Sequence, residues 1–192
     1  MCDKNLKIAV FDFDGTLIHG DSIKIAFKHL NKSAISFIVY FYIIHLYSIL
    51  KYIVTGNHQN LRKSRKKYLV QNYERLNKTE LPKSSYKYRN KEVFSFLESL
   101  VKTHKIIIVS AGFKELIELF IPENIMIIAN SLYDEYEIEI NNQQKLSELY
   151  TVFGNTVSID YGFGNSEGDI AFLNVSKNSY WISPSGAINK YE

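Results

Sequence analysis

The sequence predicts an α/β protein with a Rossmann-like parallel sheet and a helical domain inserted after the first strand. Three observations lead to this expectation. Residues 8–11 form a short apolar run that is typical of a buried strand. After residue 88, apolar runs alternate with amphipathic stretches, as in sheets whose parallel strands are joined by helices. Between these parts lies a long stretch without strand-like runs, which is too long for a connecting loop.

The elements after residue 88 follow one another in a regular order. Residues 91–102 carry apolar side chains at helical spacing, and residues 105–109 form a β-branched run typical of a buried strand. The remaining expected elements are a helix at 113–120 that stops near Pro122, a strand at 125–129, a hairpin arm with one solvated face at 133–140, a helix at 143–152, a strand at 157–161, a short helix at 168–173 and a strand at 179–182.

Domain borders follow from this pattern. Residues 1–18 and 89–192 are expected to form the sheet core, and residues 19–88 the helical insertion, with a polar hinge candidate at 83–85. A chain of 192 residues is long enough for both parts and can bury a sizeable core.

Composition excludes several classes of protein. A net charge of +3 is too mild to indicate a nucleic-acid partner. Cys2 is the only cysteine, so the chain has no internal disulfide and no cysteine-based metal site. The first residues lack the apolar core of a secretion signal, and a cytoplasmic location is the expectation that follows.

Two acids follow the first strand directly. Asp12 and Asp14 should lie at the carboxyl end of that strand, where open α/β sheets bind their ligands. Carboxylates so close together repel each other and need a positive charge nearby to stay ionised. Mg²⁺ is the candidate, because it takes oxygen ligands and commonly binds substrate phosphate as well. Gly15 permits a backbone conformation that a side chain would disfavour.

The segment Asp12-Phe13-Asp14-Gly15-Thr16 resembles the first motif of the haloacid dehalogenase superfamily. The resemblance implies that Asp12 is a nucleophile that becomes an aspartyl phosphate and that Asp14 is a general acid and base. It also makes the insertion a type I cap that closes over the site. In the phosphoserine-phosphatase-like branch of the family (subfamily IB) an Asp-Ser pair follows the first motif closely, and Asp21-Ser22 resembles that pair.

Ser110 and Lys145 extend this resemblance. Ser110 follows an expected strand, and its hydroxyl, with the N–H groups of Ala111 and Gly112 at a helix start, would form an anion cradle like the second motif of the family. Lys145 matches the lysine of the third motif, which would neutralise phosphoryl charge. The expected phosphate-binding set is Gly15, Thr16, Ser110, Ala111, Gly112 and Lys145.

Residues 160–169 resemble the fourth motif, with Asn165 where an aspartate usually stands. An asparagine carbonyl can also bind Mg²⁺, but the site loses one negative charge, so weaker metal binding is expected. The resemblance implies a metal set of Asp12, Asp14 through its backbone carbonyl, Asn165, and Asp169 just outside the ligand shell.

The expected function is that of a Mg²⁺-dependent phosphomonoester hydrolase. Its substrate is either a small phosphorylated metabolite or a phospholipid-type monoester. Two alternatives stay open, namely a phosphotransferase and a weakly active or inactive phosphate-binding protein in which Asn165 marks a decayed metal site.

The insertion contains a feature that bears on the substrate. Residues 34–50 carry no formal charge over 17 positions, just under the about 18–20 that span a membrane. A span here would separate Asp12 from the rest of the sheet, so the stretch is not expected to cross a membrane. A helix buried against its neighbours is favoured over one that dips into a membrane interface or lines an apolar pocket. The basic cluster at 62–67 would suit anionic headgroups at the inner face of a membrane. An aromatic-rich cap is also a candidate surface for a homodimer.

Overall fold

The computed structural model describes residues 7–29, 42–43, 46–47, 49–50, 53–54, 66–67, 69–76, 80–134, 142–155 and 157–192. Its centre is a sheet of six strands in the order β3-β2-β1-β4-β5-β6. The pairs from β3 to β5 are parallel, and β6 alone is antiparallel to its neighbour. The strands are β1 Ile8–Phe11, β2 Lys105–Phe113, β3 Met126–Asn130, β4 Ile159–Gly164, β5 Ser176–Ile182 and β6 Ile188–Lys190.

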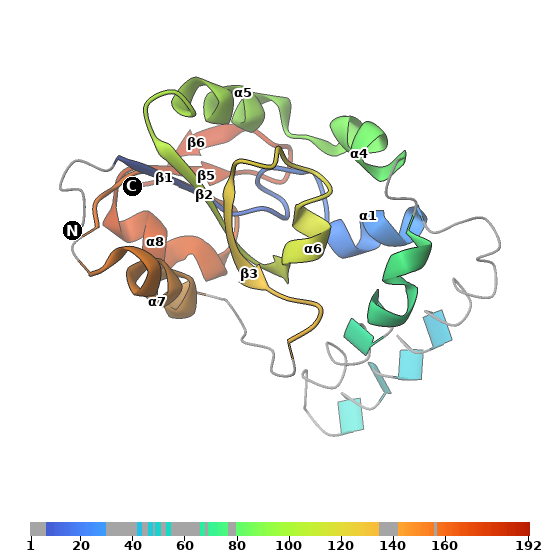
Figure 1. The fold of residues 1–192 in the computed structure, drawn as a ribbon. Helices are drawn as coiled ribbons and strands as arrows, with labels where there is room; N and C mark the ends of the chain where they lie inside the picture. The colour runs from blue at the N-terminus through green and yellow to red at the C-terminus, as the bar shows by residue number, and fades with distance from the viewer. Residues whose placement is uncertain are drawn as a thin grey trace.

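Helices cover both faces of this sheet, as Figure 1 shows. Helix α5 lies on one face, and α7 and α8 lie on the other. The described helices are α1 Ser22–Lys28, α4 Glu80–Ser85, α5 Lys91–Leu100, α6 Lys114–Ile117, α7 Asn142–Phe153 and α8 Ile170–Val175, with 3-10 turns at Tyr73–Arg75, Tyr86–Tyr88 and Glu167–Asp169. The predicted class, α/β with a Rossmann-like sheet, is confirmed.

The side chains of β1 alternate between two apolar clusters because successive residues of a strand point to opposite faces. Ala9 and Phe11 join the cluster under α5, whereas Ile8 and Val10 join the cluster under α7 and α8. All four side chains are fully buried. The strand that carries the candidate site is therefore held from both sides, which fixes the direction in which the chain leaves it.

Several predicted boundaries differ from those observed. Strand β2 continues four residues past Val109 and includes Ser110, and β4 runs from Ile159 to Gly164 instead of ending at residue 161. The helix expected at 113–120 is regular only over Lys114–Ile117. These extensions exist because β2 pairs with β3 again at Phe113 after a register shift, and β4 pairs with β5 through Gly164. Such pairing cannot be seen in the sequence of one strand alone.

The two ends of the segment 19–88 lie side by side. Ile18 and Arg89 form an antiparallel bridge, the N–H of His19 donates to the carbonyl of Tyr88 at 2.6 Å, and the N–H of Asn90 donates to the carbonyl of Leu17 at 2.9 Å. The segment thus leaves and re-enters the core through a paired stem. Residues 83–85, the expected polar hinge, form the last turn of α4. The domain borders themselves stay a prediction.

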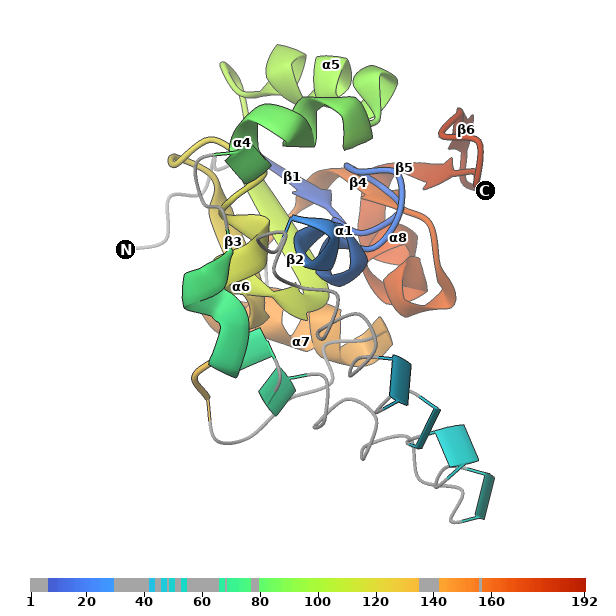
Figure 2. The same cartoon turned by 90° about the vertical axis from the view of Figure 1, so that its right-hand side faces the viewer.

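Part of the segment after α1 lies outside the described residues. The described residues of 42–54 lie apart from the sheet in both views (Figures 1 and 2), and most of their side chains are strongly exposed. The buried helix favoured from the sequence is therefore wrong for this described part of the stretch, because the described neighbours leave most of the surface of these side chains uncovered. Most of the apolar stretch at 34–50, residues 62–65 of the basic cluster and residues 135–140 of the predicted hairpin arm fall outside the described ranges. Among the described helices, none combines the length and the hydropathy that crossing a bilayer requires.

Candidate active site

Asp12 is the first residue after β1, and its side chain is only 7% exposed. The N–H of Asp12 donates to the carbonyl of Phe163 in β4 at 2.9 Å, which continues the sheet pairing and fixes the backbone. The hydroxyl of Thr16 donates to Asp12 Oδ2 at 3.3 Å. The apolar strand before Asp12 and the turn after it therefore hold this carboxylate at the carboxyl end of the sheet, as the sequence predicts.

The side chain of Lys145, in α7, reaches the carboxylate of Asp12. Its Nζ donates to Asp12 Oδ1 at 2.7 Å and to Asp169 Oδ1 at 2.6 Å, and its side chain is 4% exposed. The lysine thus bridges two acids that lie 157 positions apart in the chain. A buried ammonium needs such partners, because an isolated charge in the interior is very costly.

Asp169 is fully buried and has a structural task as well as an electrostatic one. Its Oδ2 accepts from the N–H of Asn165 at 3.0 Å, from the N–H of Ser166 at 3.0 Å and from the hydroxyl of Ser166 at 2.9 Å. Ser166 and Asp169 form a reciprocal capping box at the turn Glu167–Asp169. With Oδ1 bound to Lys145, both carboxylate oxygens of Asp169 are engaged by the protein.

Asn165 lies directly against Gly15. Gly15 has a φ of +82°, and a Cβ there would collide with the amide Nδ2 of Asn165. A side chain at position 15 would therefore be strained in the backbone and would also displace Asn165. The glycine in the first motif is what allows the loops after β1 and β4 to meet.

Asp14 turns toward the start of α1. Its Oδ1 accepts from the N–H of Ser22 at 2.7 Å, and its Oδ2 accepts from the hydroxyl of Ser22 at 3.1 Å. A Cβ built on Gly112 would stand 3.4 Å from Asp14 Oδ2 and 3.2 Å from Ser110 Oγ. The end of β2 is therefore a direct neighbour of the second acid.

The loop of Ser110 differs from the expected anion cradle. Ser110, Ala111 and Gly112 belong to the extended end of β2, and the helix begins only at Lys114. The N–H of Gly112 donates to Ser110 Oγ at 3.0 Å, so this amide is already engaged, and the carbonyl of Ala111 accepts from Asn130 Nδ2 at 3.3 Å. Because its oxygen accepts from Gly112, the hydroxyl of Ser110 is oriented to donate its proton elsewhere.

The protonation of the cluster reflects its burial. Burial raises the pKa of Asp12 to about 6, with a further rise from Asp169 and a lowering by Lys145. Burial likewise raises the pKa of Asp14 to about 7, helped by the charge of Asp21 and opposed by the hydrogen bonds from Ser22. Burial alone would lower the pKa of Lys145, but the charges of Asp12 and Asp169 outweigh this and raise it above its usual value.

The residues at this edge fit a divalent cation. Asp12 and Asp169 are buried, Asp14 is half-buried, and one ammonium lies among the three acids, so the cluster lacks positive charge. Within the described ranges no group of three or more His, Cys, Asp and Glu side chains is arranged as a metal site. The donors that the family resemblance implies are of another kind, namely the Asp12 carboxylate, the backbone carbonyl of Asp14 and the side-chain oxygen of Asn165. These are oxygen donors of the type that Mg²⁺ takes in proteins.

The raised pKa values predict that the metal-free protein loses stability as the pH rises. In the unfolded chain the carboxyls of Asp12 and Asp14 have the ordinary pKa of 3.8. In the folded protein the pKa is about 6 for Asp12 and about 7 for Asp14, so each carboxyl keeps its proton to a higher pH. Because the folded state binds more protons in this window, the free energy of unfolding falls between about pH 4 and pH 7, by on the order of a few kcal/mol. Urea unfolding in the presence of a chelator measures this fall.

Asp14→Asn is the comparison that isolates the effect of Asp14 from that of other groups. The variant has no carboxyl to ionise at this position, so its stability should fall less steeply than that of the wild type over the same pH range. Added Mg²⁺ should also flatten the wild-type curve. Parallel curves for wild type and variant would contradict the buried, proton-binding state of Asp14.

The structure brings all ten predicted site residues to one edge of the sheet. Asp12, Thr16, Lys145 and Asp169 form one hydrogen-bonded group, Gly15 and Asn165 are in contact, and Asp14 borders Ser110 and Gly112, with Ala111 between them in the chain. Sequence reasoning assigned no role to Ser22 or to Ser166, the two serines that hold the acids. A serine three residues before Asp169 was a visible capping-box signal, whereas no local pattern links Ser22 to Asp14.

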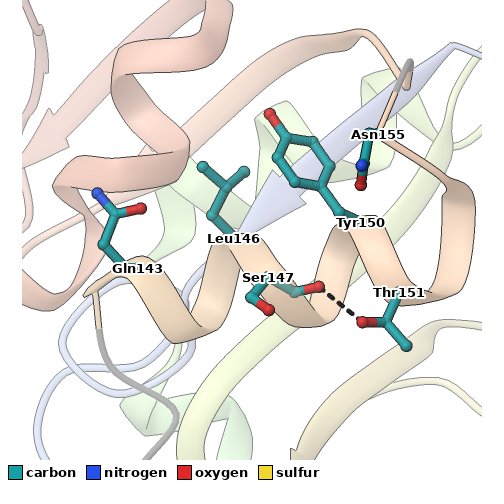
Figure 3. Close-up of a pocket in the computed structure, with 6 residues that line it drawn as sticks. All are labelled: Gln143, Leu146, Ser147, Tyr150, Thr151 and Asn155. Atoms are coloured by element: carbon teal, nitrogen blue, oxygen red, sulfur yellow. Dashed lines mark hydrogen bonds between the residues drawn. The ribbon is translucent and has the colours of Figure 1, made fainter.

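Two cavities lie away from this edge. One of about 250 Å³ lies along α7, between Gln143 and Asn155, where the hydroxyl of Thr151 donates to the carbonyl of Ser147 at 2.9 Å (Figure 3). Lys145 is on the same helix but is not among the residues that line it. The other, of about 680 Å³, is bounded by the amino-terminal ends of β2 and β3, at Lys105 and Met126. Neither contains a residue of the acidic cluster.

A mainly parallel six-stranded sheet with two acids just past the end of its central strand defines a Rossmann-like α/β protein. The chain belongs to the haloacid dehalogenase-like hydrolase family, whose model matches residues 9–174. The resemblance seen in the sequence motifs is thereby confirmed. Nine chains of solved structures match. One is a phosphoserine phosphatase in apo form, at 16% identity and a TM-score of 0.46, over 91% of this chain and 84% of that one. No curated protein matches.

Proposed function

We propose that this protein is a Mg²⁺-dependent phosphomonoester hydrolase that works through an aspartyl phosphate on Asp12. The observation that carries the proposal is the buried contact of 2.7 Å between Asp12 Oδ1 and Lys145 Nζ, beside a second acid on the same turn. A carboxylate placed beside a fixed cation can approach an anionic phosphoryl group, because the lysine offsets the charge that would otherwise repel it.

The chain's own residues supply the other parts of the reaction. Asp12 attacks the phosphorus, and the bond to the leaving oxygen breaks in line with that attack. Lys145 and the hydroxyl of Ser110 donate to the phosphoryl oxygens, and Gly15, Thr16, Ala111 and Gly112 line the loops that surround them. Ser110 suits this role because its oxygen already accepts from Gly112 and its proton is left to donate.

Asp14 serves as acid and then as base. Its pKa of about 7 is close to neutral pH, so both protonation states are populated there. In the first step Asp14 gives its proton to the leaving oxygen. In the second step it takes a proton from the water that attacks the phosphorus of the aspartyl phosphate, which regenerates Asp12 and releases phosphate.

The candidates to hold Mg²⁺ are Asp12, the backbone carbonyl of Asp14 and the side-chain oxygen of Asn165. Asp169 supports the site from outside the ligand shell, because both its oxygens are engaged by Lys145 and by the 165–166 turn. When bound, the cation supplies charge that offsets the negative oxygens of the phosphoryl group.

The direct test is hydrolysis of p-nitrophenyl phosphate with Mg²⁺, before and after chelation. The proposal expects release of p-nitrophenol that stops on chelation and returns when Mg²⁺ is restored. Activity that survives chelation would contradict the metal requirement. Absence of turnover at any Mg²⁺ concentration would favour the alternative of a phosphate-binding protein without activity. Added alcohols that divert phosphate into alkyl phosphates would indicate a phosphotransferase.

Asn165 is the residue that makes weak metal binding a specific prediction. Asn165→Asp restores the negative charge that the fourth motif usually carries, so the Mg²⁺ concentration for half-maximal rate should fall, by about tenfold. The measurement is a Mg²⁺ titration of the initial rate. Ser99→Asp is the control, because it adds the same charge at an exposed position near the end of α5, just before β2 begins at the opposite edge of the sheet. An unchanged midpoint in Asn165→Asp would remove Asn165 from the metal site.

The exposed side chains of the insertion favour a phospholipid-type monoester among the two substrate classes. Every described residue of 42–54 is apolar or tyrosine, and seven of them are strongly exposed: Tyr42, Ile43, Leu46, Tyr47, Leu50, Ile53 and Val54. Apolar side chains that lie open to water can contact acyl chains or a membrane interface. Such contact at the inner face of a membrane agrees with the cytoplasmic location that the sequence predicts.

Comparison of substrates tests this preference. Lysophosphatidate and phosphatidylglycerophosphate should be hydrolysed with a higher kcat/KM than glycerol phosphate, which has the same phosphomonoester but no acyl chain. Replacement of Leu46 and Ile53 by serine should lower the rate on the lipid substrates and leave that on glycerol phosphate unchanged. Equal rates on all three would favour a small soluble metabolite. Sedimentation of the same variants would show whether these side chains pair two copies instead, the predicted homodimer.

A further inference from the structure

Ser22 is a fully buried serine that donates two hydrogen bonds to a single carboxylate. Its N–H lies 2.7 Å from Asp14 Oδ1, and its hydroxyl lies 3.1 Å from Asp14 Oδ2. Ser22 is also the first residue of α1, the first helix of the segment predicted as the cap. Both oxygens of Asp14 are therefore held by one residue that belongs to the insertion, eight positions further along the chain.

The two oxygens of Asp14 have different surroundings. Oδ2 faces the end of β2, because a Cβ on Gly112 would stand 3.4 Å from it and 3.2 Å from Ser110 Oγ. Oδ1 is bound to an amide N–H, which can only donate, so this oxygen must remain an acceptor. A hydroxyl can donate or accept. The partner of Oδ2 can therefore adapt when that oxygen gains a proton, whereas the partner of Oδ1 cannot.

We infer that Ser22 is a positioning residue whose amide fixes Asp14 Oδ1 as an acceptor and whose hydroxyl adapts to either protonation state of Oδ2, which makes Oδ2 the oxygen that exchanges protons during catalysis. The inference rests on the proposed function, since it assigns the proton-transfer atom of the acid and base named there.

The proton balance of the two steps follows from this arrangement. When the bond between phosphorus and the leaving oxygen breaks, the proton on Oδ2 moves to that oxygen, and the Ser22 hydroxyl turns to donate to the new carboxylate. When water attacks the aspartyl phosphate, its proton moves to Oδ2, and the bond between phosphorus and Asp12 breaks. The Ser22 hydroxyl then accepts or turns aside. The hydrogen bond from the Ser22 N–H to Asp14 Oδ1 is kept throughout.

The position of Ser22 is fixed by the packing of α1 against the core. Ala26, one turn along the helix, is buried in a cluster with Phe113 of β2 and Leu116 of α6. The N–H of Lys24 donates to Asp21 Oδ1 at 3.1 Å, which caps the first turn of the same helix. A helix held in this way cannot move away from Asp14 without breaking contacts to the core, so Ser22 is a fixed support for the acid.

The test is a series of substituted phenyl phosphates that runs from p-nitrophenyl phosphate to phenyl phosphate. A poor leaving group depends on proton donation more than a good one does. Ser22→Ala should therefore lower kcat/KM for p-nitrophenyl phosphate by about threefold and for phenyl phosphate by about 30-fold, with KM changed less than kcat. Ser22→Thr keeps the hydroxyl and should restore the wild-type dependence on the leaving group.

Ser179→Ala is the matched control, because Ser179 is another buried serine, in β5, and its hydroxyl bonds only to backbone carbonyls among the described residues. It should change stability without changing the dependence on the leaving group. A uniform loss across the series in Ser22→Ala, with wild-type activity present, would overturn this inference alone. A wild-type protein that hydrolyses none of the phenyl phosphates would overturn the proposed function and this inference with it.

Discussion

Asp12→Asn should reduce phosphatase turnover by at least about 1,000-fold while the protein remains folded. The amide has nearly the shape of the carboxylate but is not a nucleophile toward phosphorus. The buried site also holds Asp12 at a raised pKa of about 6, which means that the ionised form is unfavourable in the metal-free protein. Replacing it with a neutral side chain should therefore leave the free energy of unfolding unchanged or higher at pH 8. Steady-state rates and urea unfolding measure the two quantities.

Asp160→Asn supplies the control for this variant. Asp160 lies in β4 and pairs with the exposed Lys177 at 2.6 Å, so it is an acid of the same sheet without a place in the cluster. Its variant should keep most of the activity. An Asp12→Asn protein that still turns over at a rate close to that of the wild type would remove Asp12 as the nucleophile.

Lys145→Met should cost both stability and activity. Removal of the ammonium leaves Asp12 and Asp169 buried beside each other without a positive charge, although contacts of 2.7 Å and 2.6 Å bind them in the native protein. Breaking a buried pair in this way costs about 3–5 kcal/mol. The cost should be greatest at pH 8, because at lower pH the unpaired carboxyls can take up protons instead. Turnover should fall as well, since a donor to the phosphoryl oxygens is lost.

An exposed lysine shows what the ordinary loss of a charge costs. Lys114 is half exposed and lies 3.9 Å from Glu118 on the next turn, so Lys114→Met should cost less than about 1 kcal/mol. Comparison of the two variants by urea unfolding at pH 8 separates the buried bridge from a surface pair. Equal and small losses in both would contradict the bridging role of Lys145.

Much of the fold could be predicted from the sequence because it depends on residues that are close together in the chain. The four apolar residues of β1 and the acids behind them are adjacent in the chain, and the apolar spacing of 91–102 marks α5 to within a few residues. Lys145 and Asp169 were predicted from the resemblance of their segments to the third and fourth motifs of the family. Their contact through one ammonium could not be found in that way, because it depends on how α7 packs against the sheet.

The remaining features depend on contacts between segments that are far apart. Ser110 was expected after its strand, but renewed pairing of Phe113 with Asn130 keeps the chain extended past it. Strand β6 was not predicted, because a run of three residues at Ile188–Lys190 becomes a strand only through its partner β5. The role of Ser22 also depends on contacts that the sequence alone does not show. The resemblance of Asp21-Ser22 to one branch of the family gave Ser22 no role, and its contacts with Asp14 form only once α1 packs on the core.

Trapping the covalent intermediate is the most direct test of whether Asp12 is the nucleophile. The protein is mixed with p-nitrophenyl phosphate and Mg²⁺, quenched in acid, reduced with borohydride and mapped by mass spectrometry, since borohydride converts an acyl phosphate to the alcohol. Homoserine is expected at Asp12 and at no other carboxylate, and none should form when substrate is omitted. Ongoing hydrolysis with unmodified Asp12, or homoserine at Asp14, would contradict the assignment of Asp12 as the nucleophile.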